Sequence, residues 1–155
     1  MYVDLLAALE SSGLGHVGRH SAWLYTLANL LHVLGAAFVV GGIAVFDLKV
    51  LAERGKNAHQ VGRYAIPLAA TGLAIQIPTG LLLLAVEARA LGTNPAFYVK
   101  LAFIALGLIN VALFHARFGS ALRGNVLPPE ARVYALVSLL AWIVVLLAGR
   151  MIAYL

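Results

Sequence analysis

Residues 22–49 read AWLYTLANLLHVLGAAFVVGGIAVFDLK, and this stretch decides the fold. From Ala22 to Phe46 it carries no formal charge, and one imidazole, that of His32, lies well inside it. Because about 20 apolar residues at roughly 1.5 Å per residue cover the hydrocarbon core of a bilayer, the stretch is predicted to be a membrane-spanning helix. An ionisable side chain at that depth is costly in lipid, and it usually faces a bundle interior, a partner or a cofactor.

The composition of the whole chain is that of a polytopic membrane protein. Of the 155 residues, 63% are hydrophobic and 11% are charged, which excludes a soluble globular domain. The net charge of +5 does not indicate nucleic-acid binding, because the basic residues stand in short flanks between apolar runs. The chain has no cysteine, so disulfides, thiolate metal sites, iron–sulfur clusters and covalently attached haem are excluded.

Four long apolar runs predict an all-α fold, a four-helix transmembrane bundle with up-down-up-down topology. The expected spans are roughly residues 22–48, 64–86, 95–118 and 131–153, all within one membrane domain over residues 1–155. Residues 2–11 have apolar positions at helical spacing and are expected to form a short helix on the membrane surface. The glycines at positions 13, 15 and 18 argue against a firm helix in the segment that follows.

Basic residues predict which side of the membrane each connection faces. The first and third connections hold Lys49, Arg54, Lys56, Arg63, Arg117, Arg123 and Arg132, whereas the opposite side holds Arg19, Arg89, Lys100 and Arg150. Positive residues concentrate in cytoplasmic loops. We therefore expect both termini to lie outside the cytoplasm.

Polar residues form a stripe on each of two predicted spans. In the first span, Asn29, His32 and Asp47 lie within about 60° of one another at 100° per residue. In the third span, Lys100 and Asn110 make a comparable stripe. If both stripes face inward, the bundle has a line of polar groups through its interior.

Small residues occur where helices are expected to approach closely. Gly35 lies in the first span, and Gly72, Gln76 and Gly80 share one face of the second. Such positions let two backbones, or a flat cofactor, come near. Ordinary helix packing is the simpler interpretation of these glycines, and Gln76 could join the polar line.

The chemistry that suits an intramembrane histidine here is haem binding. The three or four ligands of a zinc site are not found together, and Ser138 is the only serine within a span, so a Ser/His/Asp arrangement has no candidate. A b-type haem needs one or two imidazoles and cationic partners for its propionates. We expect His32 as axial ligand, with Lys100 and Arg150 near the propionates. The alternative is a histidine that merely hydrogen-bonds Asn29 or a facing carbonyl.

His115 is the second candidate ligand, but its depth differs from that of His32. It precedes Arg117 by two residues, whereas His32 lies in the other half of its span, so the two rings differ by on the order of 15–20 Å in depth. One haem held by both is therefore disfavoured. A separate site that joins His115 to His59 is an alternative, although His59 is more simply a solvated loop residue.

Several short motifs resemble an uncharacterised bacterial family of four-span inner-membrane proteins. They are Trp23-Leu24-Tyr25, Leu31-His32 with Gly35, Asp47-Leu48-Lys49, Thr79-Gly80, Asn94-Pro95-Ala96-Phe97 with Lys100, Asn110, His115, Ala148-Gly149-Arg150 and Ile152-Ala153-Tyr154. The resemblance covers nearly the whole chain and implies the four-span fold in the bacterial cytoplasmic membrane, but no activity. The chain departs from it at Thr26, where proline is implied, and at Asn29, where an acidic residue is implied.

More distantly, the chain is similar to copper-resistance D-type membrane proteins and to small four-span bacterial protoporphyrinogen oxidases. The latter similarity implies a haem or porphyrin role for His32 and Lys100. We expect a haem b protein that transfers electrons or acts on a porphyrin or quinone, with a quinone, a redox protein or a second copy as partner. The alternatives are a cofactor-free membrane subunit and copper handling through His16 and His20. Whether the protein is an enzyme, and with which catalytic residues, does not follow from the sequence.

Overall fold

The computed structural model describes residues 2–124 and 126–155, and these form seven α-helices and one 3-10 turn without a strand. The long helices are α3 (Ala22–Ala52), α4 (Ala58–Val86), α6 (Pro95–Phe118) and α7 (Ala131–Met151), and the short elements are α1 (Tyr2–Glu10), α2 (Gly13–His20), α5 (Ala88–Thr93) and η1 (Ala121–Arg123). Each long helix is long and apolar enough to cross a membrane. The predicted all-α, four-span fold is confirmed, and the chain is a multi-pass membrane protein.

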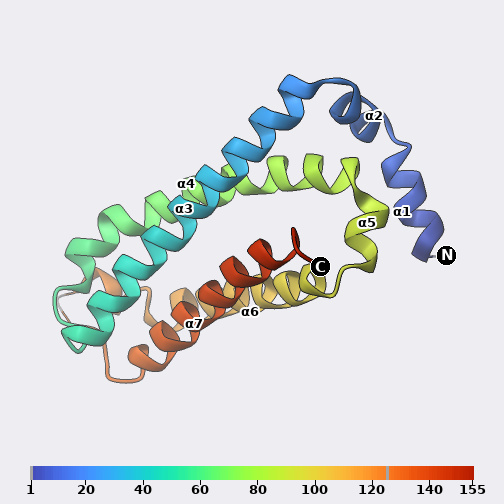
Figure 1. Ribbon diagram of the computed structural model, residues 1–155. Helices are drawn as coiled ribbons and strands as arrows, with labels where there is room; N and C mark the ends of the chain where they lie inside the picture. The colour runs from blue at the N-terminus through green and yellow to red at the C-terminus, as the bar shows by residue number, and fades with distance from the viewer. Residues whose placement is uncertain (1, 125) are drawn as a thin grey trace.

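The long helices run alternately in opposite directions and form two pairs (Figure 1). Helix α3 packs along α4, and α6 packs along α7, whereas the pairs meet chiefly through α3 and α7. The pairs lie close together at the end that holds the α3–α4 and α6–α7 connections, which we call the loop end. They diverge toward the opposite end, where α1, α2 and α5 lie, which we call the terminal end (Figure 1).

Glycines allow the close contact between α3 and α4. A Cβ atom at Gly72 would lie 2.6 Å from the carbonyl oxygen of Gly35, and one at Gly42 would lie 2.6 Å from that of Ala65. Such separations are far below van der Waals contact, so only glycine fits. The glycines predicted to bring helices together do so, and backbone packing of this kind is the usual cohesion between helices in lipid.

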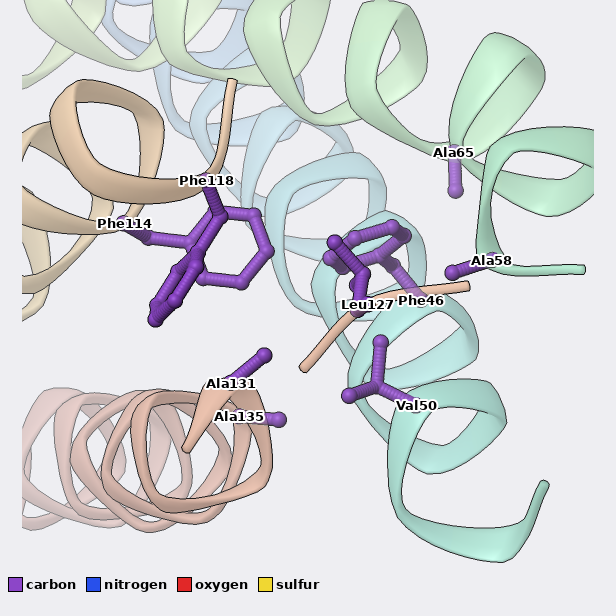
Figure 2. Packing of buried hydrophobic residues seen from close by; sticks show 9 residues of the cluster. All are labelled: Phe46, Val50, Ala58, Ala65, Phe114, Phe118, Leu127, Ala131 and Ala135. Atoms are coloured by element: carbon purple, nitrogen blue, oxygen red, sulfur yellow. The ribbon is translucent and has the colours of Figure 1, made fainter. Parts of the chain in front are cut away.

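The two pairs are joined at the loop end by a buried apolar cluster (Figure 2). Leu127, from the connection between α6 and α7, is almost completely buried and its amide donates to the carbonyl of Gly55 at 3.0 Å. Phe46 and Phe114 meet edge to face across the pairs, with ring centroids 5.8 Å apart. The complete cluster is Phe46, Val50, Ala58, Ala65, Phe114, Phe118, Leu127, Ala131 and Ala135.

The segment after α1 is helical, so the expectation that its glycines prevent a firm helix was wrong. A Cβ atom at Gly15 would lie 2.7 Å from the carbonyl oxygen of Ala85, and one at Gly18 would lie 2.4 Å from a methyl group of Val86. These glycines let α2 pack directly on the end of α4, and this packing outweighs their low helix propensity. Helix α5, between α4 and α6, was also not predicted.

Candidate functional site

His32 lies in the half of α3 nearer the terminal end, with its ring partly buried against α4. Its Nδ1 is 3.0 Å from the hydroxyl oxygen of Thr79. That hydroxyl donates its only hydrogen to a backbone carbonyl, chiefly that of Ile75 at 2.7 Å. The hydroxyl oxygen must therefore accept from the imidazole, which places the proton on Nδ1 and leaves the lone pair on Nε2. Among the described residues Nε2 has no hydrogen-bond partner.

The neighbouring turn of α4 holds the His32 region in place. The Gln76 amide donates to the carbonyl oxygen of His32 at 2.7 Å, which ties the two helices together at this level. Gly80, one turn further along α4, faces the ring, and a Cβ atom there would lie 3.0 Å from Cε1 of His32. The glycines at 35 and 80 thus make room for the backbone contact and for the imidazole, respectively. Gln76 joins His32, as the sequence allowed.

Lys100, on the other helix pair, is the charged group that acts on this imidazole. Its side chain extends past Gly149 of α7, where a Cβ atom would lie 3.7 Å from the ammonium nitrogen. Lys100 lies within electrostatic range of His32. In the described part of the chain it makes no ion pair or hydrogen bond. A free imidazole nitrogen and a cation without an ion-pair partner in the described chain therefore lie within electrostatic range of each other.

The other residues predicted for this site lie elsewhere. Asn29 is exposed, so the prediction that it lines the bundle interior was wrong. Arg150 is also exposed, stacks on the ring of Tyr154 and donates to its hydroxyl at 2.6 Å. The hydrogen-bond partner of the His32 imidazole is the hydroxyl of Thr79, and not Asn29 or a backbone carbonyl.

His115 and Asn110 belong to the loop half of α6. Asn110 is buried and its amide donates to the carbonyl of Tyr134 at 3.0 Å, which links α6 to α7. His115 is exposed, and its Nδ1 lies 2.9 Å from the carbonyl of Val111 one turn back. Neither residue contacts the His32 region, in agreement with the difference in depth expected from the sequence.

The remaining histidines do not assemble a site with His115. His59 is in the first turn of α4 and is half-buried, so the interpretation as a solvated loop residue was wrong. It lines a different surface hollow from His115. His16 and His20 stack with ring centroids 4.0 Å apart, and Nδ1 of His20 lies 2.8 Å from the carbonyl of His16. No cluster of three or more His, Cys, Asp or Glu side chains suited to a metal ion occurs among the described residues.

A second polar group lies at the loop half of the bundle, where the sequence predicted Asp47 on the inward stripe but did not include Ser138. Asp47 was assigned to the end of its span, but α3 continues to Ala52, and the carboxyl is buried with only 4% of the residue exposed. Ser138 of α7, the helix through which the second pair meets α3, is also buried. Ser138 was considered only as a nucleophile without partners. The usable signal was that it and Asp47 are both polar residues in otherwise apolar spans.

Comparison with known proteins gives a family and no activity. No curated protein and no solved structure matches the chain, so the distant resemblances to copper-resistance D-type proteins and protoporphyrinogen oxidases remain expectations. One family model, described as a family of unknown function, matches residues 5–155. This match includes all four long helices, His32 and Lys100. The chain therefore belongs to the family of unknown function DUF6644.

Proposed function

We propose that this protein binds haem b in the membrane, with Nε2 of His32 as an axial ligand to the iron. The observation that carries the proposal is the hydrogen bond from Nδ1 of His32 to the Thr79 hydroxyl, which leaves Nε2 without a proton and without a protein partner. A histidine that ligates a metal normally donates its other N–H to a fixed acceptor, which sets the tautomer and orients the ring. Thr79 has that role here.

Lys100 supports the proposal because a haem brings two carboxylates into the membrane. Its ammonium lies within electrostatic range of His32 and has no carboxylate partner in the described chain, and a propionate would neutralise it. Arg150 would have to leave the ring of Tyr154 to reach the second propionate. The glycines at 80 and 149 keep the surfaces around the imidazole and the ammonium small.

The set of donors suits a haem better than a bare metal ion. A haem iron is held by one or two protein ligands, whereas a zinc or copper ion needs three or four. When bound, haem b supplies a one-electron redox couple whose potential depends on the axial ligand and its hydrogen bonds. The residues of this chain would anchor the iron, orient the ring and balance the charge of the propionates.

We further propose that the protein resides in the bacterial cytoplasmic membrane with the terminal end outward. The excess of Lys and Arg at the loop end supports this orientation. Electrons would then pass between the haem in the outer half of the bilayer and a membrane quinone or a redox protein. A second copy of the chain would be the simplest source of a further ligand to the iron, because the described residues supply only His32.

The absorption spectrum of the protein, purified in detergent from haem-replete cells, tests the proposal. We expect a strong Soret band from bound haem in the natural protein and its loss in His32→Leu. Asn29→Leu is the matched control, because Asn29 lies one turn away on the same helix but is exposed, and it should keep the band. A colourless natural protein would contradict the proposal and favour a cofactor-free subunit, whereas a Soret band of equal intensity in His32→Leu would contradict the assignment of His32 as the ligand.

A further inference from the structure

The bundle contains a cavity of about 180 Å³ in its loop half, lined by residues from all four long helices. It shares no residue with the group around His32. The walls are apolar and aromatic, with Phe46, Phe114, Tyr134 and Trp142 around it. An engineered cavity of about 150 Å³ is enough to hold a benzene ring, so this one accommodates a single substituted six-membered ring.

Two polar atoms of residues that line the cavity are buried without a hydrogen-bond partner in the described part of the chain. They are Oδ2 of Asp47 and Nε1 of Trp142, whose residues are 4% and 5% exposed. A buried polar group without a partner costs on the order of 1–3 kcal/mol, and an indole N–H can only donate. The uncharged form of a carboxyl is the one that costs least to bury without a cation, and in that form it also donates. The cavity therefore offers two donors to a ligand that carries acceptors.

The cavity opens sideways between α4 and α6. Its exposed lining residues are Ala70 of α4 together with Leu108 and His115 of α6, whereas nothing that lines it from α3 or α7 is exposed. Helices α4 and α6 also make few direct contacts with each other. In a membrane, an opening between two spanning helices at this depth faces lipid, so a ligand would enter from the bilayer and not from water.

From these three features we infer that the cavity binds the ring of a lipid-soluble benzoquinone. A quinone ring is flat, uncharged and carries two carbonyl acceptors, which match the indole N–H of Trp142 and the carboxyl of Asp47. Its isoprenoid tail would leave through the mouth between α4 and α6. A lipid acyl chain would fill the same volume but would leave both donors without partners. The role of the quinone as an electron carrier rests on the proposed function, whereas the binding of the quinone does not require haem.

Quenching of Trp142 fluorescence tests the inference. The chain has two tryptophans, and Trp23 is 87% exposed, so Trp23→Phe leaves Trp142 as the only indole reporter. The probe is a benzoquinone with one isoprenoid unit, titrated into the haem-free full-length protein in detergent. We expect saturable quenching, and a Kd at least tenfold higher when Asp47→Leu is added, since Leu fills a similar volume and removes the polar partner.

A second pair of variants protects the test against misfolding. Ala70→Phe should block the mouth and raise the Kd at least tenfold, whereas Ala74→Phe, one turn along α4 on an exposed position that does not line the cavity, should leave it unchanged. Linear, non-saturating quenching in every variant would mean that the quinone only partitions into detergent, and would overturn the inference. So would a Kd in Asp47→Leu or in Ala70→Phe that equals the Kd of the Trp23→Phe protein, or equal displacement of the quinone by a fatty acid of matched length. Because the protein is haem-free, a failed haem experiment does not affect these outcomes.

Discussion

Replacement of Thr79 by Val removes the acceptor for the His32 imidazole together with the hydroxyl's own donation to the carbonyl of Ile75. Valine has nearly the shape of threonine, and Thr79 is 9% exposed, so solvent does not readily take the place of the hydroxyl. The imidazole then has no fixed acceptor for Nδ1–H, and the proton is free to move to Nε2. Only the tautomer with its proton on Nδ1 presents the lone pair of Nε2 to a metal.

The expected loss of haem affinity follows from the hydrogen bond between His32 and Thr79. The Nδ1–Oγ1 distance is 3.0 Å, which is an ordinary hydrogen bond, and removal of one such partner behind a metal-ligating histidine costs about 10- to 100-fold in affinity. At 1.4 kcal/mol per factor of ten, this corresponds to about 1.4–2.8 kcal/mol. Thr79→Ser, which keeps the hydroxyl, should lose little haem affinity.

Haem titration of the haem-free protein in detergent, followed at the Soret band, measures this difference. His32→Leu gives the baseline for haem that merely partitions into the micelle. Equal affinity for the natural protein and Thr79→Val, together with a clear loss in His32→Leu, would refute the role assigned to the hydroxyl. Equal affinity in all three would refute the assignment of His32 as well.

Three further outcomes follow from the packing and charges. Lys100→Met should lower haem affinity about tenfold or more, since a hydrogen bond to a charged group contributes about 1.5–3 kcal/mol, while Lys100→Arg keeps most of it; the same titration measures both. Leu127→Ala should lower the free energy of unfolding by about 2–5 kcal/mol, because Leu127 is 2% exposed in the loop-end cluster; reversible unfolding in mixed micelles measures it. Gly72→Ala should lower the free energy of unfolding by about 1–3 kcal/mol, measured in the same way, because the added Cβ would overlap the backbone of α3. Gly41→Ala, with open space around it, should be neutral or stabilise by up to about 1 kcal/mol, and equal losses at the two glycines would contradict the packing argument.

The helices could be predicted because a bilayer imposes length and apolarity on every span. The start of α6 was also encoded locally: Asn94 caps the helix by accepting from the amide of Ala96 at 2.9 Å, and proline follows it. The helix at residues 13–20 could not be predicted, because its glycines are explained only by the surface of α4 on which they pack.

The candidate site was predictable in part. Helical periodicity placed His32 on a polar face of its own helix, but it cannot tell which neighbouring helix that face meets, so Thr79 was not identified as the partner. Asn29 shares the stripe and yet is exposed, because which residues of a stripe a neighbouring helix covers is a tertiary feature. Asp47 and Ser138 are 91 positions apart (138 − 47), and no local pattern connects them.

Pulsed EPR of the ferric protein, grown with ¹⁵N-labelled histidine, tests most directly whether His32 binds iron. The account predicts a strong coupling between the iron and a histidine ¹⁵N in the natural protein, and its loss in His32→Leu while Asn29→Leu retains it. A ferric haem with no histidine coupling, or a coupling that persists in His32→Leu, would contradict the assignment.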